Sequence, residues 1–390
     1  MSREPAARRV REAVRVHLTA GLAAGVFPGA VVAVARGPHL LVHEAFGYAQ
    51  VIPRPLPATR ETVFDLASLT KPVATATVVL QLCAEGALDL AACVASYLPR
   101  SRGAWAARAT LRHLLAHTAG LAAWEMLYLP GPRRPGGRRA PACRSVAQAV
   151  ARIAAGPAPA PPGARIEYSD LGFIVLGHIA ERAAGEPLDR CVRRRVLVPL
   201  GMRATRFAPP AAWRSRCAAT EAGNAYERSK AAALGLGRGF RWRTRVIRGQ
   251  VHDGNAWHLG RGVAGHAGLF GTAADLVRFG AAMLAGGALA GVRILPAPVL
   301  AEATRDQTPG LGPAARGLGW ALGGWPFAGR RASARAYGHT GFTGTSILID
   351  PARDLVVVLL TNRVHPRADS DAIVGFRPAF HDAVIGALDG

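Results

Sequence analysis

A serine and a lysine three residues apart, Ser68 and Lys71, carry the clearest chemical signal in this sequence. Only two of the 48 basic residues are lysines, Lys71 and Lys230, so arginine supplies the positive charge almost everywhere. A desolvated lysine, unlike an arginine, can lose its proton near neutral pH. A Ser-x-x-Lys pair at a helix start would therefore place a nucleophilic hydroxyl beside an amine of lowered pKa. The alternative is a helix-capping serine followed by a solvated lysine.

Two later motifs could complete such a site. Tyr168-Ser169-Asp170 follows a proline-rich turn and opens an apolar helical pattern. A tyrosine hydroxyl near a cationic lysine can act as a shared acid and base. Residues 338–344 read Gly-His-Thr-Gly-Phe-Thr-Gly at the start of a strand, and their glycines would let a substrate approach the backbone closely. Alone, each motif has a structural alternative: a helix cap after a packed tyrosine, and a glycine-rich strand start.

The periodicity of apolar residues predicts the elements that would position these motifs. Helices are predicted over 5–25, from 68 to just before Gly86, and over 111–117, 145–155, 171–184, 187–196, 272–285 and 376–388. Strands are predicted over 29–34, 39–42, 317–323, 345–349 and 355–360. Residues 205–265 contain few clear elements and are predicted to be long loops.

Strands at both ends of the chain and a helical middle favour one antiparallel sheet with an inserted domain. Residues 1–67 and 265–390 would form an α/β sheet domain that is discontinuous in sequence. Residues 68–264 would form a mostly helical domain. We expect the active site between the two.

Composition excludes several classes of protein. The chain has 390 residues, of which 50% are hydrophobic and 19% charged, which is typical of a folded chain. No run approaches the roughly 18 apolar residues of a membrane-spanning helix. The formal charge of +23 would suit a nucleic-acid or membrane-surface binder. The arginines are scattered, however, and their clusters at 132–139 and 193–195 are not interleaved with aromatic residues.

The cysteines and the N-terminal segment suggest a cytoplasmic protein. Five cysteines lie far apart without a Cys-x-x-Cys motif, which favours reduced thiols over a zinc site or disulfide framework. The first 18 residues are basic but lack the apolar core and cleavage site of a signal peptide.

Other polar groups are left without an assigned role. His113 and His117 have zincin spacing but lack the required glutamate. A glycine-rich stretch holds further candidates for a metal site, a loop or the edge of an active site: His252, Asp253, His258 and His266. Lys230 is interpreted as a solvated residue in a polar loop.

Taken in order, the motifs resemble the serine β-lactamase and penicillin-binding protein superfamily, in its class C β-lactamase and esterase-like branch. Residues 64–71 resemble its nucleophile motif, 168–170 its Tyr-x-Asn motif and 339–341 its Lys-Thr-Gly strand motif. Residues 114–121 resemble its Leu-Leu-x-His-Thr-Ser-Gly-Leu segment. The resemblance runs from about residue 10 to the C-terminus. It implies a β-lactamase/transpeptidase-like α/β fold: an antiparallel sheet flanked by helices, plus a mostly helical domain.

The resemblance also implies roles for particular residues. Ser68 would be the acylated nucleophile, and Lys71 and Tyr168 would carry protons to and from it. The backbone N–H groups of Ser68 and Phe342 would form the oxyanion hole. The residues implied along the substrate are Asp170, His339, Thr340 and Gly341. No metal or organic cofactor is implied.

This chain departs from the family pattern at three positions. His339 stands where β-lactamases have lysine, and its charge would change around pH 6.5. Asp170 replaces the usual asparagine and cannot donate a hydrogen bond as an amide does when ionised. Together with the bulky Phe342, these changes argue against efficient β-lactam hydrolysis. Carboxypeptidase, amidase and esterase members of the superfamily also have histidine at the position of His339.

We therefore expect a serine hydrolase that forms a Ser68 acyl-enzyme with a small-molecule or peptide-like substrate. The scissile bond would belong to an ester, amide, peptide or β-lactam. One alternative is a catalytically silent module that binds a peptide-like ligand on the same fold. A second is a basic nucleic-acid binder. We expect neither a nucleic-acid partner nor a membrane span.

Overall fold

The two ends of the chain build one sheet, as the sequence predicts. The computed structural model describes residues 3–98, 105–131 and 139–390. Its main sheet is antiparallel, with seven strands in the order β11-β12-β13-β14-β1-β2-β3. The strands are β1 (Gly29–Arg36), β2 (His39–Gln50), β3 (Leu56–Pro57), β11 (Ala321–Leu322), β12 (Tyr337–Thr340), β13 (Ser346–Asp350) and β14 (Leu355–Thr361). The first and last parts of the chain meet at the β1–β14 pair, in which Ala30 faces Thr361.

The central strands are apolar because both faces of the sheet are covered. Every residue of β14 is buried, and so are all but the last of β1. Such continuous apolar runs are typical of strands packed on both sides. Alternate residues enter different cores: Val32 joins one apolar cluster, while its neighbours Val31 and Ala33 join the other.

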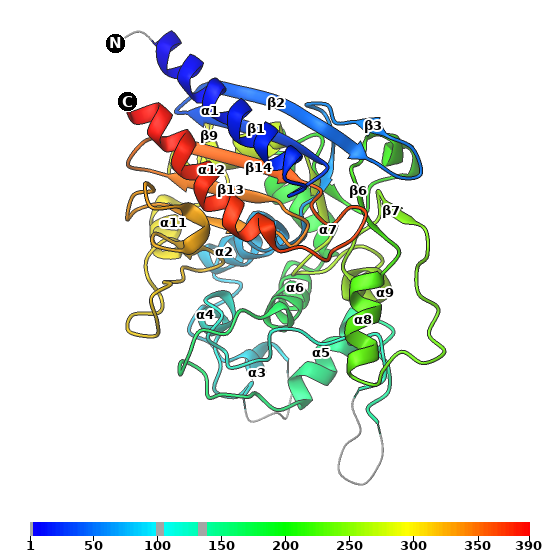
Figure 1. Cartoon of the computed structure of the whole chain (residues 1–390). Coiled ribbons are helices and arrows are strands. Elements are labelled where there is room, and N and C mark those ends of the chain that lie inside the picture. Colours follow the sequence, from blue (N-terminus) through cyan, green and yellow to red (C-terminus); the bar gives the residue numbers. More distant parts are fainter. Residues whose placement is uncertain (1–2, 99–104, 132–138) are drawn as a thin grey trace.

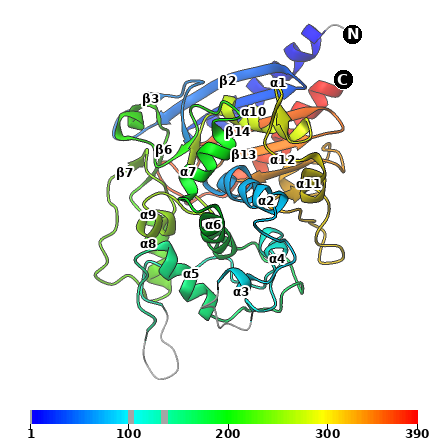
Figure 2. The same cartoon turned by 180° about the vertical axis from the view of Figure 1, so that it is seen from behind.

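Helices form the two outer layers. On one face α1 (Arg3–Ala23) packs beside α12 (Ala372–Asp389), as Figure 1 shows. On the other face α10 (Ala273–Leu284) contacts β14, β1 and β13 (Figure 2). Leu276, Phe279 and Met283 are buried at the i, i+3 and i+7 positions of α10.

The mostly helical region lies to one side of the sheet (Figure 1). At its centre is α6 (Asp170–Ala184), which contacts α2 (Thr77–Ala84), α4 (Leu111–Leu115), α5 (Val146–Ala155) and α7 (Leu188–Val192). Around them are α3 (Val94–Tyr97), α8 (Ala225–Ala233) and α9 (Gly254–Gly260), whereas α11 (Ala297–Ala303) lies nearer the sheet (Figures 1 and 2). The remaining strands are short: β4 (Phe64–Asp65), β8 (Leu269–Gly271) and β5 (Arg206–Phe207) in one sheet, β6 (Ala219–Ala222) with β7 (Val246–Arg248), and β9 (Ala288–Leu289) with β10 (Val292–Arg293).

The predicted fold class is confirmed, but some local predictions are wrong. Residues 205–265 are not only loops, because they hold α8, α9 and the strands β5 to β7. α8 contains no large aliphatic residue, so an apolar pattern does not reveal it. The strand predicted over 317–323 is observed only as β11. Gly317 and Gly319 instead let the backbone pack closely against neighbouring segments, since a Cβ on Gly317 would lie 2.2 Å from the Ala303 carbonyl oxygen. The domain boundaries at 67/68 and 264/265 stay a prediction.

One stretch has the length and apolar composition of a membrane span. It is Ala67–Ala84, and 83% of it is buried inside the fold. Burial in a protein core accounts for its composition.

Candidate active site

Ser68 lies just past a strained residue. Strand β4 ends at Asp65, and the chain then turns through η1 (Ala67–Leu69, a 3₁₀ turn) and η2 (Lys71–Ala76, a π-helical turn) before α2 begins. Ala67 has a φ of 47°, which is unfavourable for a residue with a side chain by about 1–2 kcal/mol. The Asp65 carboxylate holds this turn by accepting bonds from the backbone N–H groups of Ala67 (2.9 Å) and His252 (2.7 Å). Ser68 therefore lies within a tight turn and does not cap a helix.

Lys71 joins Ser68 to Asp170. Its Nζ lies 2.8 Å from Ser68 Oγ, 2.6 Å from Asp170 Oδ1 and 3.2 Å from the carbonyl oxygen of His266. The Lys71 side chain is fully buried, whereas that of Asp170 is 20% exposed. Burial acts to lower the pKa of Lys71, but Asp170 and Tyr168 outweigh it and raise that pKa above its usual 10.5. This is the reverse of the lowered pKa that desolvation alone predicts.

The start of α6 places Tyr168 and Asp170 beside Lys71. Ser169 caps the helix, because its Oγ accepts the Gly172 N–H at 3.2 Å and donates to the Ala122 carbonyl at 2.7 Å. Lys71 Nζ lies 4.8 Å from the centroid of the Tyr168 ring. The two residues flanking the cap therefore share one ammonium group.

His117, in the segment 114–121, packs against Tyr168. His117 adopts a φ of 58°, and its ring packs against the Tyr168 ring with centroids 4.5 Å apart. His117 Nδ1 accepts the Ser169 N–H at 3.0 Å. Burial, followed by the nearby Arg316 and Lys71, holds the pKa of His117 well below its usual 6.5. A neutral His117 can keep this acceptor role.

Strand β12 brings His339, Thr340 and the adjoining Gly341 to the same region. His339 is 3% exposed, and its Nδ1 lies 2.8 Å from the Thr340 carbonyl oxygen. Burial, then Lys71 and Arg316, hold the pKa of His339 well below 6.5. His339 is therefore neutral around pH 6.5, where the sequence predicts that its charge changes. A Cβ on Gly341 would lie 2.1 Å from Thr345 Oγ1, so only glycine fits there.

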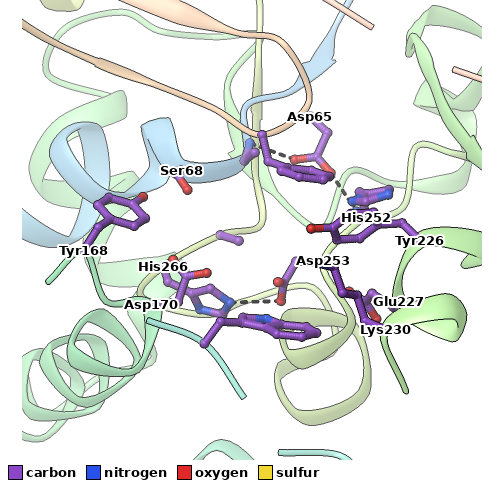
Figure 3. A pocket seen from close by; sticks show the side chains of 14 residues that line it. Asp65, Ser68, Tyr168, Asp170, Tyr226, Glu227, Lys230, His252, Asp253 and His266 are labelled. Carbon is purple, nitrogen blue, oxygen red and sulfur yellow. Dashed lines mark hydrogen bonds and ion pairs between the residues drawn. The ribbon is translucent and has the colours of Figure 1, made fainter. Parts of the chain in front are cut away.

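A cavity of about 320 Å³ opens onto Ser68. Figure 3 shows Ser68 and Tyr168 on one side of it, Asp170, His266 and Asp253 along another, and Tyr226, Glu227 and Lys230 further away. Its lining residues are Asp65, Ala67, Ser68, Trp124, Tyr168, Asp170, Tyr226, Glu227, Lys230, His252, Asp253, His266, Ala267 and Phe342. Of the residues expected along the substrate, Asp170 lines this cavity, whereas His339, Thr340 and Gly341 do not.

Lys230 has a place that its sequence context did not suggest. It is exposed, as expected, but it belongs to α8 and lines the cavity. Its Nζ lies 5.5 Å from the centroid of the Tyr226 ring. Lys71 and Lys230, the two lysines of the chain, therefore both lie at this site. The scarcity of lysine was the signal that could have linked them.

A histidine–carboxylate pair forms one wall of the cavity. His266 Nε2 lies 2.9 Å from Asp253 Oδ1. Burial acts to raise the pKa of Asp253, but His266 outweighs it and the pKa falls to about 2. Asp170, Asp253 and His266 have donor atoms within 4.8 Å of one another, the set that a metal ion could use. The ammonium of Lys71 already pairs with Asp170 in that set.

Glu227 is a buried carboxyl that the sequence reasoning did not identify. Tyr128 donates its hydroxyl proton to Glu227 Oε2 at 2.5 Å, and the Gly254 N–H donates to Oε1 at 2.8 Å. Burial and the nearby Asp253 raise the pKa of Glu227. These partners come from two segments, around Tyr128 and at residues 253–254, both distant from Glu227 in the sequence, so no local pattern marks the residue.

Comparison with known proteins identifies the family. The model of the β-lactamase family matches residues 14–376. A protein of Salmonella schwarzengrund, provisionally named a D-alanyl-D-alanine carboxypeptidase, is 32% identical over 387 residues, covering 90% of this chain and 84% of its own. The chain therefore belongs to the β-lactamase family.

Solved structures agree with this family. The hydrolase EstCE1, described as having promiscuous acyltransferase activity, superposes with a TM-score of 0.74 at 25% identity and covers 98% of this chain and all of its own. A penicillin-binding protein homologue from Caulobacter crescentus has a TM-score of 0.73 at 22% identity, covering 97% and 98%, and shares the fold. The protein is a β-lactamase-like serine hydrolase, and the comparisons favour neither the silent binding module nor the nucleic-acid binder.

Proposed function

We propose that the protein hydrolyses an ester or amide bond through an acyl-enzyme on Ser68. The observation that carries this proposal is the 2.8 Å contact between Lys71 Nζ and Ser68 Oγ at the edge of a cavity of about 320 Å³. A serine hydroxyl that accepts a hydrogen bond from a buried lysine at the edge of a cavity is placed to act as a nucleophile.

The first half of the reaction would acylate the enzyme. Ser68 Oγ attacks the substrate carbonyl carbon while its proton passes to the Lys71–Tyr168 pair. The backbone N–H groups of Ser68 and Phe342 stabilise the negative oxygen of the tetrahedral intermediate. The bond to the leaving group then breaks, and the same proton passes to that group.

The second half would release the acid. A water molecule attacks the acyl carbon, gives its proton to the Lys71–Tyr168 pair, and the bond to Ser68 Oγ breaks as the proton returns to that oxygen. Asp170 would keep Lys71 in place, since 2.6 Å separate Asp170 Oδ1 from Lys71 Nζ. The net change is hydrolysis, with the enzyme restored.

The chemistry of the cavity supports esters and amides over β-lactams. The strand motif supplies no cation, because His339 is buried and neutral. Phe342 contacts both Tyr226 and His252, with ring centroids 5.0 and 5.6 Å apart, and so narrows the cavity beside the strand. We propose that His339, Thr340 and Gly341 act by shaping this edge and that Asp170 touches the substrate directly.

We further propose a cytoplasmic location. The five cysteines are all free thiols, none of them joined to another. Burial raises the pKa of Cys83, Cys191 and Cys217 to about 11 in each case, so these thiols are unreactive. Unreactive free thiols suit a reducing compartment.

Labelling with a fluorophosphonate tests the nucleophile. The intact mass of the protein should rise by one adduct, and peptide mapping should place it on Ser68. Ser68→Ala should abolish the adduct, whereas Ser145→Ala, which removes the cap of α5 outside the cavity, should leave it unchanged. A folded protein that takes no adduct, or takes it on another serine, would refute the proposal.

A further inference from the structure

Arg316 is a buried cation with no carboxylate partner among the residues that the structure describes. Its exposed fraction is 3%. Its backbone is fixed on both sides, because its N–H donates to Thr308 Oγ1 at 2.9 Å and its carbonyl accepts the Gln307 N–H at 2.8 Å. Burying an unpaired charge is costly, so the position of Arg316 calls for a counter-charge.

The guanidinium of Arg316 lies close to two aromatic rings. Its Cζ is 3.7 Å from the centroid of Trp325 and 5.5 Å from the centroid of Tyr168. Its Nε is buried and has no hydrogen-bond partner within the described residues. Burial lowers the pKa of Arg316 to about 10, which leaves it charged at neutral pH.

Within the described part of the chain, no carboxylate forms an ion pair with Arg316 near Tyr168. His117 and His339 face the same space, and each has a buried Nε2 without a partner in the described structure. Arg316 is among the charges that depress the pKa of both histidines. On the other side Lys71 is paired with Asp170. Two cations therefore lie near the Tyr168 ring, 4.8 and 5.5 Å from its centroid, and among the described residues only Lys71 has a carboxylate partner.

We propose that Arg316 is a positioning residue that stabilises the negative charge formed on the Tyr168 oxygen when Tyr168 gives up its proton. The proposal rests on the function proposed above, in which Tyr168 and Lys71 share the proton of Ser68. Trp325 holds the guanidinium by stacking, which leaves its charge directed at Tyr168 without a competing anion. Since the strand motif supplies only the neutral His339, residue 316 provides the second positive charge.

Direct binding of a substrate carboxylate by Arg316 is disfavoured by its location. The guanidinium is almost fully enclosed, and Arg316 does not line the cavity that holds Ser68. Its influence on a substrate would pass through Tyr168, which does line it. Loss of a residue that acts through Tyr168 should lower kcat, whereas loss of a residue that binds the substrate should raise KM.

The test compares Arg316→Met with Arg316→Lys, using p-nitrophenyl butyrate as a neutral ester. For Arg316→Met we expect kcat to fall by about 100-fold with KM within about threefold of wild type. The acid limb of the kcat/KM profile should move to higher pH, because a cation that favours loss of the proton is gone. Arg316→Lys should restore most of kcat. Arg152→Met, which removes another little-exposed arginine paired with Glu125, should leave the profile in place.

Each outcome has a defined meaning. A wild-type enzyme that is not labelled at Ser68 and does not cleave the ester would refute the proposed function itself. An active wild type whose Arg316→Met variant keeps its kcat and acid limb would overturn the role of Arg316 alone. So would a variant in which only KM rises, since that result indicates substrate binding. If Arg316→Met does not fold, Trp325→Leu, which removes the ring next to the guanidinium, supplies the pH profile. An acid limb that stays at the wild-type pH in Trp325→Leu would then overturn the proposal.

Discussion

Replacing Asp170 by asparagine should move the acid limb of the activity profile to lower pH. Asp170 Oδ1 lies 2.6 Å from Lys71 Nζ and raises the pKa of Lys71 against the opposing effect of burial. Asp170→Asn removes that negative charge, so that only Tyr168 still opposes the effect of burial on the pKa of Lys71. The Lys71–Tyr168 pair should then accept the Ser68 proton at lower pH. The direction is opposite to that expected for Arg316→Met.

The strength of the ion pair can be worked out from its geometry. Coulomb's law at an effective permittivity of 20 gives roughly 6 kcal/mol for unit charges at the observed separation of 2.6 Å. Removing the buried ammonium from water cancels part of this attraction. We therefore expect Lys71→Met and Asp170→Asn to show a coupling free energy of about 3 kcal/mol in a double-mutant cycle.

The ion pair should also make stability depend on pH. Because the pKa of Lys71 is raised above 10.5, the contribution of the charged Lys71 to stability is present below pH 10.5 and is lost as pH rises through the higher folded-state pKa.

The assay is a pH series of kcat/KM with a neutral ester, combined with urea unfolding of the four proteins of the cycle at pH 7. Asp389→Asn is the matched control, because it breaks a 3.0 Å ion pair with Arg353 at the end of α12. That variant should leave the acid limb unmoved. The reasoning fails if Asp170→Asn keeps the wild-type limb, or if the coupling is close to zero.

Three other expectations test separate parts of the structure. Burial holds the pKa of His381 near 4, so about 3 kcal/mol of stability should be lost between pH 6.5 and 4; unfolding of His381→Asn should not show this loss. Gly341→Ala should lower stability by about 2 kcal/mol or more and slow labelling of Ser68, because the new Cβ meets Thr345 at 2.1 Å; Gly375→Ala, with open space in α12, should be neutral or stabilising. Lys230→Met should raise the KM of an ester that carries a carboxylate about tenfold more than the KM of its uncharged analogue, because Lys230 lines the cavity. Equal changes in the two KM values would show that the Lys230 charge does not face the substrate.

The nucleophile motif could be predicted from sequence because its parts are local. The i, i+3 spacing of Ser68 and Lys71 brings the two side chains together in any helical turn, whatever more distant parts of the fold do. The shape of the turn was less predictable: a helix was expected from residue 68, whereas a 3₁₀ turn and a π-helical turn come first. The strain at Ala67 is held by Asp65, which depends on the distant His252.

The electrostatics of the site could not be predicted, because they depend on tertiary contacts. The pKa of Lys71 rises since Asp170 comes within 2.6 Å, and nothing local to either residue gives that distance. Lys230 and Glu227 lie on a helix that has no large aliphatic residue and so does not stand out in the sequence. The sheet was predictable from alternation and apolar runs, because its core strands are buried on both faces.

The pairing of β1 with β14 also has a consequence for the order of folding. These strands lie over 300 residues apart in the chain, so the β1–β2 hairpin emerges from the ribosome long before its other neighbour exists. The turn that holds Ser68 also lacks two of its hydrogen bonds until residues 343–345 are made. Thr345 Oγ1 donates to the Leu66 carbonyl and Thr343 Oγ1 donates to the Asp65 carbonyl. Such long-range contacts slow folding and leave an apolar strand edge exposed during synthesis. A nascent chain should therefore acquire a reactive serine only after its last strand has been made.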